Sequence, residues 1–138
     1  MQASDSQPHN RPNLRHHHRV PADLVVEVTA ESGASVECAC ANLSRAGLML
    51  SCTPDQVSQI LPNNMTIAPR QAVRLHARFK LPVLSIQSVQ ISVACDVIYV
   101  RRVSRDCFQV GMHFVDFEGS GRDYVDQYMD RRLQDTPV

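Results

Sequence analysis

A short polar stretch between two apolar runs carries the side chains best suited to binding a ligand. It reads Asn42-Leu43-Ser44-Arg45-Ala46-Gly47 and combines an amide, a hydroxyl and a guanidinium with a closing glycine. Asn, Ser and Gly are common turn residues, so a plain hairpin turn is one interpretation. Glycine also accepts positive φ and lets a ligand approach the backbone, which makes a binding turn the other. The stretch alone leaves both interpretations open.

A basic segment upstream favours the binding turn. Arg15-His16-His17-His18-Arg19 precedes Val20-Pro21, and the proline predicts a loop that leads into a strand. Residues 9–19 hold three arginines and four histidines but no acidic residue. Arginine suits bidentate contacts with phosphates and guanine edges. On a chain with a formal net charge of zero, such an arm predicts a small anionic ligand rather than DNA or RNA.

Length and hydropathy predict one domain in the cytoplasm. The chain has 138 residues, enough for a single core. No apolar run approaches the ~20 residues of a membrane helix, so we expect no membrane insertion. The N-terminus is polar and contains Pro8 and Pro12, which is unlike a signal peptide.

The cysteines and histidines predict no metal site. The odd cysteine count and the lack of a C-x-x-C pair favour buried, reduced thiols over a disulfide framework. Three adjacent histidines diverge on an extended loop, and no complete tetrahedral ligand set is visible. A His/Cys metal-binding module therefore remains the weaker alternative. The cysteines are Cys38, Cys40, Cys52, Cys95 and Cys107.

The hydrophobic pattern predicts a mainly β fold. Alternation is clearest from Val73 to Leu81, where Pro82 is expected to end the strand. Thr53-Pro54-Asp55-Gln56 predicts a helix start with a capping box. An apolar stripe predicts a closing helix over residues 120–134. Six strands with these helices indicate a small antiparallel barrel. The expected strands are 24–29, 35–41, 48–52, 73–81, 89–100 and 107–114.

Two motifs in this order resemble the PilZ domain family. Arg-x-x-x-Arg lies just before the first strand, and Asn-x-Ser-x-x-Gly lies between the second and third. Arg11 with Arg15 also fits the first motif. The resemblance implies a PilZ-type split barrel, with a flexible tail at 1–13 and a domain at 14–135. Within it we expect a ligand-binding arm at 14–20, the barrel at 21–117 and the closing helix. The residues that match the motifs are Arg15, Arg19, Asn42, Ser44 and Gly47.

The resemblance implies cyclic di-GMP as the ligand, and the residue chemistry suits it. An arginine fork matches either the phosphates or the O6 and N7 acceptors of a guanine. Asn42 and Ser44 would add neutral hydrogen bonds to a base, and Gly47 a close backbone approach. Leu14 precedes the first motif arginine, where a second ligand molecule would be held, and it offers no charge. Secondary candidates for ligand contact are Leu14, Arg11, His16 and Arg45.

By the same resemblance, the chain is expected to be a receptor rather than an enzyme. Ligand binding would order the N-terminal arm and signal to an unidentified protein effector in motility, exopolysaccharide or virulence control. No nucleophile–base set at a recognisable spacing predicts catalysis. No cofactor is expected beyond the ligand. An alternative is a PilZ-like scaffold that binds protein but no nucleotide.

Overall fold

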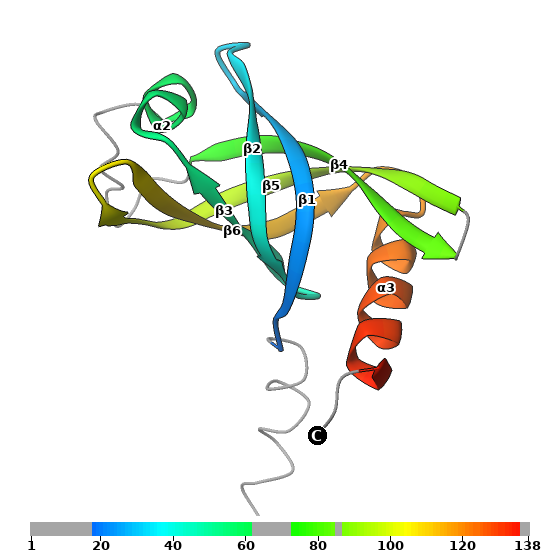
Figure 1. Cartoon of the computed structure of the whole chain (residues 1–138). Helices are drawn as coiled ribbons and strands as arrows, with labels where there is room; N and C mark the ends of the chain where they lie inside the picture. The colour runs from blue at the N-terminus through cyan, green and yellow to red at the C-terminus, as the bar shows by residue number, and fades with distance from the viewer. Residues whose placement is uncertain (1–17, 62–72, 85–86, 136–138) are drawn as a thin grey trace, which may run out of the picture.

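Six antiparallel strands close into a barrel in the computed structural model, which describes residues 18–61, 73–84 and 87–135. The order around the barrel is β1-β2-β3-β6-β5-β4, and β4 pairs with β1 to close it. A short helix and a C-terminal helix lie outside the barrel (Figure 1), so the predicted fold is confirmed. The elements are β1 (Val20–Ala30), β2 (Ser35–Leu43), β3 (Gly47–Cys52), α2 (Pro54–Ile60), β4 (Arg74–Leu84), β5 (Gln87–Ser104), β6 (Cys107–Phe117) and α3 (Gly121–Asp135).

The core lies inside the barrel and is built from strand alternation. In β4, Leu75, Ala77 and Phe79 are buried, while Arg78 and Lys80 face solvent, as the period of two predicts. Burying a leucine or phenylalanine side chain contributes roughly 1.5–3 kcal/mol. The inward faces of the other strands join the same apolar cluster, so the closed sheet is the main source of stability.

The capping box predicted for α2 is present. Gln56 N–H donates to Thr53 Oγ1 at 3.2 Å, and Thr53 N–H donates to Gln56 Oε1 at 2.9 Å. Pro54 occupies the first turn, where its missing N–H costs nothing. The helix buries Val57 and Ile60 and thereby closes one end of the barrel.

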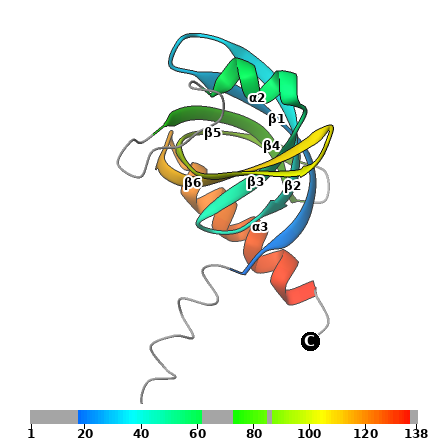
Figure 2. The same ribbon diagram turned by 90° about the vertical axis from the view of Figure 1, so that its left-hand side faces the viewer.

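The closing helix α3 packs its apolar stripe against the barrel. Val125, Tyr128 and Met129 are buried in the same core cluster as the strands, so the predicted stripe is confirmed. Seen from the side, α3 runs obliquely beneath the barrel (Figure 2). Neither helix in the described part of the chain is long and apolar enough to cross a membrane.

The prediction that Pro82 ends its strand is wrong. β4 continues to Leu84, and Pro82 pairs with Ser88 next to a register shift. The β1–β4 pairs run only from Glu27↔Arg78 to Ala30↔Leu75, so Pro82 lies beyond the paired part of that edge. A proline is tolerated at such an edge or bulge because no ladder N–H is needed there.

The first strand begins earlier than predicted. β1 starts at Val20 rather than at residue 24, and Pro21 lies opposite Asn42 beside a bulge. The expected tail at 1–13 and most of the arm at 14–20 lie outside the described residues. The early start matters because it extends the sheet up to Arg19, at the edge of the predicted site.

Candidate functional site

The strand register brings the two sequence motifs together. Val20 pairs with Leu43 and Pro21 with Asn42, so the start of β1 lies beside the β2–β3 turn (Figure 1). Arg19 Nη1 donates a hydrogen bond of 2.7 Å to Asn42 Oδ1. Residues 23 positions apart in the chain therefore form one polar surface, with Arg19 exposed and Asn42 half-buried.

The hydroxyl of Ser44 lies inside the turn. The side chain is only 1% exposed, and Oγ accepts hydrogen bonds of 3.2 Å from the N–H groups of both Ala46 and Gly47. It lies 3.3 Å from the Gly47 carbonyl, to which it donates. Ser44 N–H also donates to that carbonyl at 2.8 Å. Ser44 thus closes the turn, and its contact with a ligand base stays a prediction.

Gly47 is required by packing against a neighbouring strand. Among the described glycines only Gly33 and Gly119 have positive φ, so Gly47 does not use the left-handed conformation that glycine permits. A Cβ added at Gly47 would lie 1.9 Å from the backbone carbonyl oxygen of Met112. Glycine is needed here because the backbone of β6, which pairs with β3 at Gly47↔His113, leaves no room for a side chain.

The Arg45 side chain binds α3. Its guanidinium pairs with the carboxylates of Asp126, at 3.2 Å, and Asp130, and its side chain is 14% exposed. Burial alone would lower the pKa of Arg45. The hydrogen bonds and charges of Asp130 and Asp126 outweigh that effect and raise the pKa above its usual value, so the guanidinium stays charged. Sequence reasoning missed these partners. The available signal was the i,i+4 pair of Arg122 and Asp126 on the closing helix.

Beneath the motif surface lies a neutral thiol. Cys40 Sγ donates to the Asn42 carbonyl at 3.3 Å, and burial raises the pKa of Cys40 to about 12. All five cysteines are free; Cys107 is half-buried and the others are buried, as predicted. Within the described ranges no cluster of three or more His, Cys, Asp or Glu side chains is arranged to hold a metal ion. Arg11, Leu14, Arg15 and His16 lie outside those ranges.

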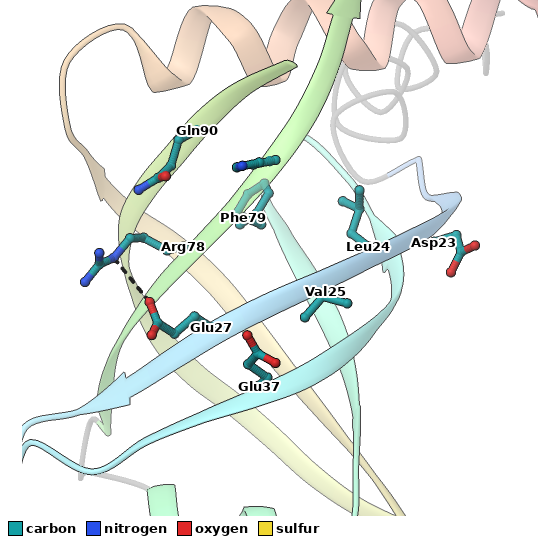
Figure 3. Close-up of a pocket in the computed structure, with 9 residues that line it drawn as sticks. Asp23, Leu24, Val25, Glu27, Glu37, Arg78, Phe79 and Gln90 are labelled. Carbon is teal, nitrogen blue, oxygen red and sulfur yellow. Dashed lines mark ion pairs between the residues drawn. The ribbon is translucent and has the colours of Figure 1, made fainter. Parts of the chain in front are cut away.

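A hollow of about 450 Å³ lies elsewhere, over β1 and β4 (Figure 3). Leu24, Val25 and Phe79 form its apolar part, and its lining also carries charges of both signs. Glu27 and Arg78 pair across it at 3.6 Å. None of the described motif residues lines this hollow, so it is distinct from the surface formed by Arg19 and Asn42.

Comparison with solved structures shows the fold of this chain in other proteins. It matches an inhibitor of motility from Bacillus subtilis (MotI/DgrA) with a TM-score of 0.64, 15% identity, and coverage of 87% of this chain and 51% of that one. It matches PlzA of Borreliella burgdorferi in complex with cyclic di-GMP with a TM-score of 0.58, 10% identity and coverage of 99% and 59%. The chain thus spans little more than half of these two proteins.

A third match is of domain size. The PilZ domain of CeSA from a cellulose-synthesizing bacterium aligns with a TM-score of 0.51, 16% identity and coverage of 84% of this chain and 98% of that one. No curated protein matches the sequence. The family model described as PilZ domain matches residues 13–131, which include both motifs. The chain therefore belongs to the PilZ domain family.

Proposed function

We propose that this protein is a non-enzymatic receptor for cyclic di-GMP. The observation that carries the proposal is the 2.7 Å hydrogen bond between Arg19 and Asn42, which joins one residue from each motif into one surface. The likeness to PlzA, whose structure holds cyclic di-GMP, supports the proposal. We place Arg15, Arg19 and Asn42 in direct contact with the ligand, and Ser44 and Gly47 in the turn that shapes the surface.

The chemistry of Arg19 and Asn42 suits a guanine nucleotide. Arg19 is exposed and hydrogen-bonded to a neutral amide, so its positive charge is available to a phosphate or a guanine edge. Because Asn42 Oδ1 accepts from Arg19, the amide nitrogen is the group with which Asn42 would donate to a base. Together they would hold the base while Arg15 neutralises phosphate.

Ligand binding would act as a switch on the arm at residues 14–20. Charge-assisted hydrogen bonds from the arm to the ligand would order it against the start of β1. The ordered arm and the bound nucleotide would form a new surface for a protein effector in the cytoplasm. Neither DNA nor RNA is needed as a partner, since the chain has no net charge to attract a polyanion.

Saturating cyclic di-GMP is expected to raise the melting temperature. A ligand that binds only the native state adds roughly 2.7 kcal/mol at about 100 times its dissociation constant. For a domain of this size that stabilisation corresponds to an increase of roughly 5–10 °C. Differential scanning fluorimetry with cyclic di-GMP, and with GTP as the control, measures it. An unchanged melting curve would refute the receptor proposal.

We expect one ligand molecule per chain. The side chain of Leu14 offers neither charge nor hydrogen-bond donors to a second molecule, and Arg45 is engaged by the carboxylates of α3. Leu14→Arg should raise the calorimetric ratio of cyclic di-GMP to protein from near one toward two, because the arginine guanidinium can bind a phosphate or guanine of a second molecule. A ratio of two for the wild-type protein would contradict the prediction that Leu14 limits binding to one ligand molecule per chain.

A further inference from the structure

Ser44 closes the β2–β3 turn by hydrogen bonds within the turn, and Arg45 links the same turn to α3. Arg45 Nη1 lies 3.3 Å from the carbonyl oxygen of Asp126 and 3.2 Å from its Oδ1, and Nη2 contacts Asp130. These contacts join positions 81 and 85 residues apart. An ordinary hairpin turn needs no such support, so the helix has a role at this end of the barrel beyond covering the core.

Arg122 joins both sides of this contact. Its Nη2 donates to the backbone carbonyl of Arg45 at 2.7 Å, and its Nη1 donates to Asp126 Oδ1 at 3.1 Å. One guanidinium therefore fixes the turn backbone and also orients the carboxylate that holds the Arg45 side chain. The planar guanidinium holds its two donor nitrogens in a fixed fork, whereas a lysine ammonium offers its donors from one nitrogen on a flexible stem.

Arg122 is itself held in place by packing against β6. Its guanidinium lies over the Phe117 ring, 4.6 Å from the centroid, and that ring packs on Phe114 at 5.0 Å. Phe114 N–H donates to the carbonyl of Ala46 at 2.8 Å, and Ala46 is part of the β2–β3 turn. Helix, strand and turn thus form a closed circuit of contacts around Arg45.

From this geometry we infer that Arg122 is a positioning residue for the ligand surface, and that α3 docking and ligand binding are thermodynamically linked. The inference rests on the proposed function. The turn begins after Leu43, one residue beyond Asn42, so holding its backbone fixes where the Asn42 amide and Arg19 meet. By linkage, a ligand that needs the ordered turn must strengthen the docking of α3 by the same factor by which α3 strengthens ligand binding.

The test compares Arg122→Gln with a matched control. Arg122→Gln removes the fork while the pairs of Arg45 with Asp126 and Asp130 remain available. The control, Arg78→Gln, removes an exposed arginine that pairs with Glu27. Arg78 lines the hollow over β1 and β4, not the β2–β3 turn. Calorimetric titration with cyclic di-GMP should show a weakening of about fivefold to tenfold for Arg122→Gln. Arg78→Gln should bind as wild type.

Hydrogen exchange supplies a readout that a purely structural role would not change. In wild type, cyclic di-GMP should slow amide exchange along α3 as well as in the turn, and Arg122→Gln should abolish the slowing along α3. Arg122→Lys, which keeps the charge but not the fork, should fall between the two. The melting temperatures of the ligand-free variants check that each is folded.

The outcomes separate this inference from the proposed function. Wild-type protein that fails to bind cyclic di-GMP would overturn the receptor proposal and the linkage with it. Wild-type protein that binds, together with Arg122→Gln of equal affinity and equal α3 protection, would overturn only the positioning role.

Discussion

Replacing Gly47 with alanine is expected to lower the free energy of unfolding by about 3 kcal/mol. The new Cβ would lie 1.9 Å from the Met112 carbonyl oxygen and 3.1 Å from His113 Cα, and both are backbone atoms that no rotamer change can move. Relief requires β3 and β6 to separate where Gly47 pairs with His113. For this size of domain the melting temperature should fall by roughly 10 °C.

Gly33→Ala is the matched control for this experiment. Gly33 has φ of +100°, but nothing lies within 4 Å of an added Cβ, so its cost comes from backbone strain alone. That strain is worth roughly 1–2 kcal/mol. Urea unfolding of both variants compares the two costs. A Gly47→Ala protein that is no less stable than Gly33→Ala would show that the strands do not need this close approach.

Features governed by neighbouring residues were predictable from the sequence. The capping box of Thr53 and Gln56 and the alternation along β4 follow local rules, and the structure confirms both. The proline rules were less reliable. Pro21 and Pro82 lie within strands because a bulge or an unpaired edge removes the need for their N–H groups.

The two motifs were recognisable in the sequence, but the contacts that Gly47 and Arg45 make were not. Both motifs were found, and the register of β1 with β2 places Arg19 beside Asn42. The environments of Gly47 and Arg45 depend on β6 and α3, which come much later in the chain. The hexapeptide that resembles a binding turn therefore also packs against β6 through Gly47 and binds α3 through Arg45. The spacing of its residues alone does not reveal these contacts.

Arg19→Ala is expected to weaken cyclic di-GMP binding by about tenfold to hundredfold while leaving the fold intact. Hydrogen bonds to a charged group contribute roughly 1.5–3 kcal/mol, and Arg19 would make them to the ligand as well as to Asn42. The side chain is exposed, so its removal opens no cavity in the core. Arg15→Ala should have an effect of the same size, because the resemblance assigns it the matching position of the motif.

Three further variants make this prediction specific. Arg105→Ala removes an exposed arginine from the β5–β6 turn and should bind as wild type. Arg11→Ala should matter less than Arg19→Ala, since an equal loss would shift the motif to Arg11 and Arg15. In the double variant with Asn42→Ala, the loss should be smaller than the sum of the single losses, because Arg19 and Asn42 share a hydrogen bond. Calorimetric titration of each variant decides the matter, and strictly additive losses would show that the two residues act on the ligand independently.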